Sequence, residues 1–145
     1  MREDGIMGGN GWFQTGPYHE DLSAAFRRAQ EESLVNQGDG FEGRSIDDLW
    51  MDPEWWEYIG TGGTGSVVDQ YALIAPDAEE EFGTMRPLTE QEVREWAPGG
   101  RPTYAEWSKA LDELEFYPGR GSGRCTVLYD DGKPVEMVYW GVTAD

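Results

Sequence analysis

The chain has 145 residues, of which 29 are acidic and 11 basic, and the net charge of −18 extends over both halves of the sequence. Nucleic acids and anionic lipids bind proteins through Lys and Arg, so the composition argues against both as direct partners and favours a basic protein or a cation. The single cysteine, Cys125, excludes an intramolecular disulfide, and no apolar run approaches the roughly 18 residues that a membrane helix needs. We expect a soluble, cytoplasmic protein.

The length fits one domain, and seven Trp and seven Tyr supply large apolar groups for a single core. We expect the polar residues 1–7 to be a frayed extension and residues 8–145 to form one α+β domain. Within the glycine-rich segment 8–17, Trp12 and Phe13 indicate a short strand or an ordered arm that docks on the core.

From His19 to Val35, apolar residues recur every three or four positions, which predicts the first helix. The glycines of 38–40 should end it. His19 is the only histidine, and nucleophilic catalysis of the Ser/His/Asp or Cys/His kind needs an imidazole base. Since His19 lies at the start of a helix, we expect it to have a capping or surface role.

Two short helices are predicted next, at 46–51 and 53–59. Ser45 has the spacing of a capping box, and Asp52 can cap the second helix because Pro53 suits a first helical position.

The glycine-rich stretch 60–65 is predicted to be a flexible loop. Such a loop can bind phosphate on its backbone N–H groups, but the lysine of a phosphate-binding loop is missing and the surrounding charge is negative. Residues 66–74 form either a helix capped by Ser66 or a strand, because two β-branched valines follow. The acidic run Glu79–Glu81 is expected to be a hydrated turn.

Capping boxes predict two more helices: Thr89 and Glu92 start one at 90–97, and Thr103 starts another that ends before Pro118. The apolar faces of these helices carry Trp96 and Trp107, which we expect in the core or close to it. We expect the same of Trp140 in the last strand. The basic, glycine-rich segment 120–124 should be a linker.

Two β-rich runs flank an Asp-Gly pair and predict a C-terminal hairpin at 124–140. Because an isolated hairpin is only marginally stable, it needs helices or a third strand, taken from Trp12–Phe13 or from Val67–Ile74. The fold class is therefore α+β, with several short helices on a small antiparallel sheet. Cys125 enters the hairpin and is expected to be a small buried hydrophobe rather than a reactive thiol.

The segment from Asp39 to Glu81 combines twelve carboxylates and one basic residue with three Trp and two Tyr. Adjacent residues on a helix point about 100° apart, so of Trp55 and Trp56 one can enter the core while the other stays exposed among carboxylates. Burial of both is the alternative. The predicted partner-binding site consists of Asp47, Glu54, Trp55, Trp56, Glu57, Tyr58, Gly62 and Gly63.

In its acidity and its many Trp and Gly residues, the chain resembles the small acidic immunity proteins of bacterial toxin systems. The resemblance implies a non-enzymatic inhibitor that occludes a basic partner, such as a nuclease, another toxin or a nucleic-acid-binding protein whose ligand it mimics. An alternative is a carboxylate-dependent or divalent-metal-dependent enzyme with its site near Asp47–Glu57, although no EF-hand spacing is present. Homo-oligomerisation through a hydrophobic patch is a further possibility. We predict no catalytic residue, metal ligand or cofactor.

Overall fold

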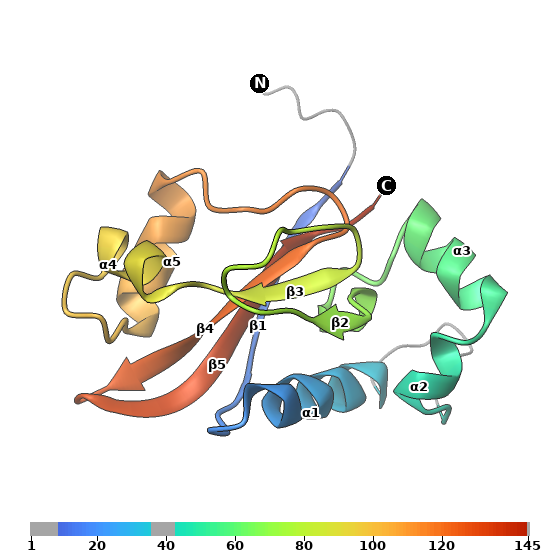
Figure 1. Cartoon of the computed structure of the whole chain (residues 1–145), viewed down its shortest axis with the longest axis horizontal. Helices are drawn as coiled ribbons and strands as arrows, with labels where there is room; N and C mark the ends of the chain where they lie inside the picture. The colour runs from blue at the N-terminus through green and yellow to red at the C-terminus, as the bar shows by residue number, and fades with distance from the viewer. Residues whose placement is uncertain (1–8, 36–42, 145) are drawn as a thin grey trace.

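Five strands form one mixed sheet in the order β1-β5-β4-β3-β2, with helices on both faces (Figure 1). The computed structural model describes residues 9–35 and 43–144. The strands are β1 (Gly11–Pro17), β2 (Ala72–Leu73), β3 (Thr84–Pro87), β4 (Gly123–Asp130) and β5 (Lys133–Val142). The helices are α1 (Leu22–Val35), α2 (Ile46–Leu49), α3 (Pro53–Thr61), α4 (Glu90–Trp96) and α5 (Tyr104–Glu113), with a 3-10 turn, η2 (Val67–Asp69). The expected frayed extension at 1–7 and the expected helix end at 38–40 fall outside the described residues.

The C-terminal hairpin is confirmed and is longer than predicted. Asp131 and Gly132 have positive φ angles of 53° and 74°, which a tight two-residue turn between twisted strands requires. Both candidates for additional strands join the sheet: β1 pairs antiparallel with β5, and the segment 66–74 contains η2 followed by the two-residue strand β2. The choice between helix and strand for 66–74 therefore has no single answer.

The sheet is mixed rather than antiparallel throughout, because β2, β3 and β4 run parallel. The sequence did not predict β3, whose segment Thr84–Pro87 ends in a proline and contains an arginine. The strand β4 begins at Gly123, and Arg124 is its second residue. Of the predicted linker 120–124, only the part before Gly123 therefore lies outside the strand.

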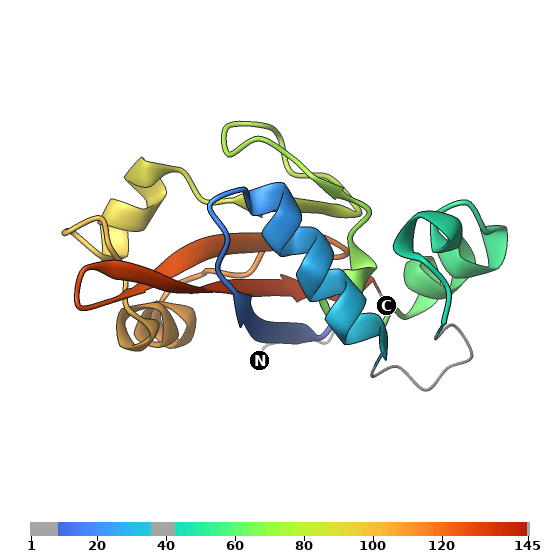
Figure 2. The ribbon, with the colours of Figure 1, turned by 90° about the horizontal axis from the view of Figure 1, so that it is seen from below.

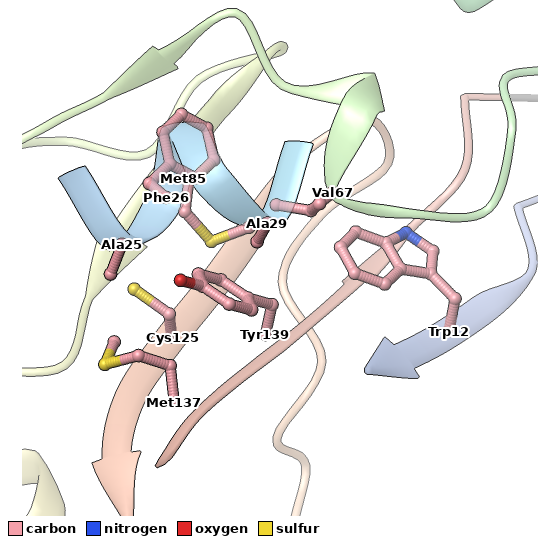
Figure 3. Close-up of a cluster of buried hydrophobic side chains, with 9 residues drawn as sticks. All are labelled: Trp12, Ala25, Phe26, Ala29, Val67, Met85, Cys125, Met137 and Tyr139. Atoms are coloured by element: carbon pink, nitrogen blue, oxygen red, sulfur yellow. The ribbon is translucent and has the colours of Figure 1, made fainter. Parts of the chain in front are cut away.

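Both faces of the sheet are buried, one under α1 and the other under α4 and α5 (Figure 2). Along β5 the side chains alternate: Met137 and Tyr139 face α1, whereas Val138 and Trp140 face α5. On the α1 face, Figure 3 shows strand residues Cys125, Met137 and Tyr139 packed with helix residues Ala25, Phe26 and Ala29.

The predicted core tryptophans lie where expected. Trp107 and Trp140 are fully buried, and Trp96 is partly buried against the same cluster. The capping boxes of α4 and α5 are both present, formed by Thr89 with Glu92 and by Thr103 with Glu106. Within the described residues, none of the helices combines the length and apolar character required to cross a membrane.

A third hydrophobic cluster lies beyond the end of the sheet, where α2 and α3 form a separate helical unit (Figures 1 and 2). Leu34 of α1 and Val68 of η2 reach this cluster from the body of the domain. The helical unit is thus attached to the domain by apolar contacts.

Candidate partner-binding surface

The helical unit begins with two N-caps that its sequence encodes. The Ser45 hydroxyl accepts a hydrogen bond from the Asp48 N–H at 3.1 Å, and the Asp52 carboxylate accepts one from the Glu54 N–H at 2.9 Å. Pro53 occupies the first turn of α3, where its missing N–H costs nothing. The two helices follow one another so closely that Trp50 lies between them.

Trp55 and Trp56 separate as their helical positions require. Trp55 is fully buried, whereas Trp56 remains 40% exposed. The Trp56 ring is held in place because its Nε1–H donates to the carbonyl oxygen of Trp50 at 2.7 Å. Trp56 is therefore an ordered ring on the surface.

Three rings contact one another at this point. Ring centroids are 4.9 Å apart for Trp50 and Trp56, 5.7 Å for Trp50 and Tyr71, and 5.4 Å for Trp56 and Tyr71. Tyr71 is 44% exposed and Trp50 is partly buried. Aromatic pairs at these separations gain contact energy beyond the area they bury. The rings thus form a preorganised surface.

Phe82, which is 43% exposed, lies on the neighbouring loop. Glycines make room for it and for Tyr71: a Cβ at Gly83 would lie 2.6 Å from the Tyr71 ring, and a Cβ at Gly121 would collide with the Phe82 ring. Tyr71, Phe82 and Gly121 each come within two residues of the start of a parallel strand, so the topology brings them to the same end of the sheet. We define Trp50, Trp56, Tyr71 and Phe82 as the aromatic surface.

Carboxylates on α2 and α3 differ in whether they are already paired. Asp47 accepts a hydrogen bond from Arg27 at 3.0 Å, and Asp52 accepts one from Arg44 at 2.8 Å. The bond from Arg44 lowers the pKa of Asp52. Glu54 and Glu57 are exposed and form no ion pair within the described residues, so their charges remain available to a partner.

Four of the predicted site residues are buried or partly buried rather than exposed. Trp55 belongs to the core, and Tyr58 is half-buried with its ring 5.8 Å from that of Trp55. Of the two adjacent tryptophans, Trp56 is thus the one that presents its ring at the surface, whereas the Trp55 ring packs in the core. Gly62 and Gly63 belong to the loop that follows α3.

The helix α3 extends over residues 60 and 61 of the predicted loop, and the remaining residues, 62–65, lie around an internal anion, the carboxylate of Asp69. Its Oδ1 accepts hydrogen bonds from the Thr64 N–H at 2.8 Å and the Thr64 hydroxyl at 2.6 Å, and its Oδ2 accepts one from the Gly65 N–H at 3.1 Å. A Cβ at Gly63 would lie 2.8 Å from Oδ2, which explains the glycine. Burial raises the pKa of Asp69, and these hydrogen bonds oppose the shift. The sequence predicted a flexible loop; the structure shows that Asp69 gives Thr64 and Gly65 internal hydrogen-bond partners.

The acidic turn is also more structured than expected. Glu79 and Glu81 are exposed, but Glu80 accepts hydrogen bonds from Arg86 at 2.9 Å and from Arg124 at 2.7 Å. The pair of arginines holds the pKa of Glu80 below its usual value although burial opposes it. Arg86 also binds Glu92 through both of its terminal nitrogens, at 2.7 and 2.9 Å. This network fastens the loop before β3 to the sheet.

His19 and Cys125 lie where the sequence indicated, one on the surface and the other in the core. His19 is exposed and its Nδ1 accepts a hydrogen bond from the Asp21 N–H at 2.9 Å. Cys125 is fully buried, and burial raises the pKa of its thiol to about 12, so it is an inert core residue. Within 9–35 and 43–144, His, Cys, Asp and Glu side chains form no group of three or more that could hold a metal ion.

Trp50, Tyr71 and Phe82 complete the surface, and sequence reasoning did not assign them to it. Tyr71 and Phe82 lie outside α3, on the segments that precede β2 and β3, and Tyr71 contacts the rings of both Trp50 and Trp56. Two glycines mark the positions of the Tyr71 and Phe82 rings. Gly83 directly follows Phe82 in the sequence, and Gly121 lies against the Phe82 ring in the structure. No protein-family model, curated protein or solved structure matches the chain.

Proposed function

We propose that this protein is a non-enzymatic, acidic binding protein of the inhibitor or immunity type, which acts in the cytoplasm by occluding a basic protein partner. The aromatic surface would be the centre of the interface, with Glu54 and Glu57 at its rim. The observation that carries the proposal is the cluster of mutually contacting rings, exposed at Trp56 and Tyr71, on a chain of net charge −18.

The chemistry of the rings supports a basic partner. Trp and Tyr are the residues most often found as interface hot spots, because they bury a large area at low entropic cost. Their faces also attract the cationic groups of Lys and Arg. Because the Trp56 Nε1–H already donates to the Trp50 carbonyl oxygen, the Trp56 ring loses little conformational entropy on binding.

The charge of the molecule supports the same class of partner. Long-range attraction between −18 and a basic surface speeds encounter, and unpaired carboxylates beside the rings can direct it to this end of the molecule. Asp47 and Asp52 contribute less, because Arg27 and Arg44 already neutralise them.

A mutational comparison on the purified partner tests the proposal. The partner is isolated by affinity capture at low ionic strength, and its affinity for each variant is measured by calorimetry. Tyr71→Ala should weaken binding about tenfold or more, as loss of a hot-spot ring does. Tyr104→Ala is the matched control, because Tyr104 is 42% exposed, close to the 44% of Tyr71, and lies on α5 away from the aromatic surface.

A second pair of variants removes charge without removing a ring. Glu54→Gln with Glu57→Gln should slow association more than Glu113→Gln with Glu115→Gln, since all four carboxylates are exposed and only the first two flank the rings. Affinity that is indifferent to ionic strength, or equal losses from the Tyr71 and Tyr104 variants, would contradict the proposal.

A further inference from the structure

A second recognition feature lies at the opposite border of the sheet, where β1 is an edge strand. Along β1 the residues alternate between those that hydrogen-bond to β5 and those whose backbone groups point away from it. Val142, opposite Gly11, directs its N–H to Ser122 and its C=O to Gly121, so Gly11 does not bond to β5. Thr143, by contrast, donates its N–H to the carbonyl of Asn10 at 3.0 Å.

It follows that Gly11, Phe13 and Thr15 turn their backbone N–H and C=O groups outward. All three residues are exposed, and Phe13 is 51% exposed. Within the described part of the chain, β5 is the sole strand that pairs with β1. The outer border of β1 therefore presents alternating donors and acceptors over most of its seven residues.

Edge strands of this kind are usually protected, and β1 carries few of the usual protections. Proteins shield an edge with charged side chains, proline, bulges or a very short strand. The opposite edge, β2, has two residues, whereas β1 contains no charged residue and has a proline only at its last position, Pro17. In a chain in which 28% of residues are charged, this uncharged, extended edge is suited to accept another strand.

We propose that β1 binds an extended segment of a basic protein, which adds a sixth strand to the sheet by backbone hydrogen bonding. The net charge of the chain selects this occupant: a second copy would bring a further −18 toward a molecule of the same charge, whereas a Lys- or Arg-bearing strand is attracted to that molecule. The site is separate from the aromatic surface, so it does not depend on the function proposed above.

Amide hydrogen exchange with a model peptide tests the proposal directly. The probe is a peptide of alternating lysine and valine, as long as β1; the control has proline in place of valine, with equal charge and no ability to extend a sheet. The lysine-valine peptide should slow exchange at Gly11, Phe13 and Thr15 and leave Trp12 and Gln14 unchanged, because these already bond to β5.

Variants of Thr15 identify the edge as the site. Thr15→Pro removes an outward N–H and no bond within the sheet, so the fold is retained, and peptide affinity should fall about fivefold or more. Thr15→Val keeps the N–H and should bind as the natural chain does. Tyr71→Ala should leave the amide protection intact, which separates this test from that of the aromatic surface.

Three results would overturn the proposal. One is protection of the same amides by the proline peptide, and another is equal affinity of the Thr15→Pro and Thr15→Val variants. The third is a homodimer, seen by light scattering without peptide and lost in Thr15→Pro, which would assign the edge to a second copy of the chain.

Discussion

Two glutamines are buried in the core, and their side-chain amides differ in what they contact. Gln30 is 1% exposed, and its Nε2 donates to the Gln70 carbonyl oxygen at 2.7 Å. Gln70 is fully buried, and within the described residues neither its Nε2 nor its Oε1 has a hydrogen-bond partner. A buried polar group without a partner costs about 1–3 kcal/mol in desolvation.

The contrast predicts opposite effects of the same substitution. Gln70→Met keeps the side-chain length and removes the unpaired amide, so the free energy of unfolding should rise by about 1 kcal/mol, or roughly 2–4 °C in Tm. Gln30→Met leaves the Gln70 carbonyl unpaired and should lower the free energy of unfolding by about 1–3 kcal/mol. Urea denaturation of both variants measures the difference. Destabilisation by Gln70→Met equal to that of Gln30→Met would show that the amide is satisfied in solution.

Single residues were predictable where one local rule decides their position. The separation of Trp55 from Trp56 follows from helix geometry alone, and the burial of Cys125 follows from its place in a hairpin strand. Asp69 was not predictable, because its carboxylate became an internal partner for a glycine loop only once η2 had folded beside it. A charge in the sequence does not say whether its partner is solvent or backbone.

At the scale of elements, the network of Arg86 predicts how stability depends on pH. Hydrogen bonds from Arg86 hold the pKa of Glu92 at about 2, below its ordinary value of 4.5, although partial burial opposes the shift. A carboxylate with a depressed pKa stabilises the fold above its unfolded value. This stabilisation should be fully present above pH 4.5 and should be lost as the pH falls from 4.5 toward 2.

Glu92→Gln tests this dependence because glutamine can still accept the capping hydrogen bond from Thr89. The variant should lose about 1–2 kcal/mol at neutral pH, less than the full shift implies, since solvent screens the partly exposed carboxylate. Its stability should also change less between pH 6 and 2 than that of the natural chain, by roughly the same amount. Glu106→Gln is the control, because Glu106 caps α5 in the same way and forms no ion pair in the described residues. Parallel pH profiles for the natural chain and Glu92→Gln would contradict the prediction.

The helices were more predictable than the parallel strands, and the reason is physical. The caps at Thr89 and Thr103 and the Asp-Gly turn are local, so a few adjacent residues encode them. The strand β3 owes its place to a neighbour far along the chain, since Met85 pairs with Gly123. Four residues containing an arginine and a proline carry no strand signal of their own.

At the scale of the whole molecule, the same distinction separates what the sequence revealed of the candidate surface from what it did not. Trp56, Glu54 and Glu57 share one helix and could be grouped by spacing. Tyr71, which contacts Trp56, and Phe82 come from the segments that precede the parallel strands β2 and β3. The surface thus depends on the topology of the sheet, and only the residues on α3 could be grouped from their spacing in the sequence.

The net charge of −18 opposes the compact fold, because like charges lie closer together in the folded state than in the unfolded chain. Ion pairs act in the opposite direction, but those on the surface, such as Arg28 with Glu32 and Arg94 with Glu90, contribute about 0–1 kcal/mol each. The Arg86 network is partly buried, so salt screens it less. Repulsion should therefore dominate the response to ionic strength.

Adding sodium chloride should raise the urea concentration at which half of the protein is unfolded, because mobile ions screen repulsion over distances beyond about 10 Å. Glu113→Gln with Glu115→Gln should show a smaller salt response, since both residues are exposed and unpaired within the described chain. Glu32→Gln with Glu90→Gln removes carboxylates that face arginines and serves as the comparison with equal charge change. A midpoint that falls with salt would contradict the prediction, because the ion pairs would then outweigh the repulsion. In that case the Glu32/Glu90 double variant, rather than the Glu113/Glu115 one, would show the smaller salt response.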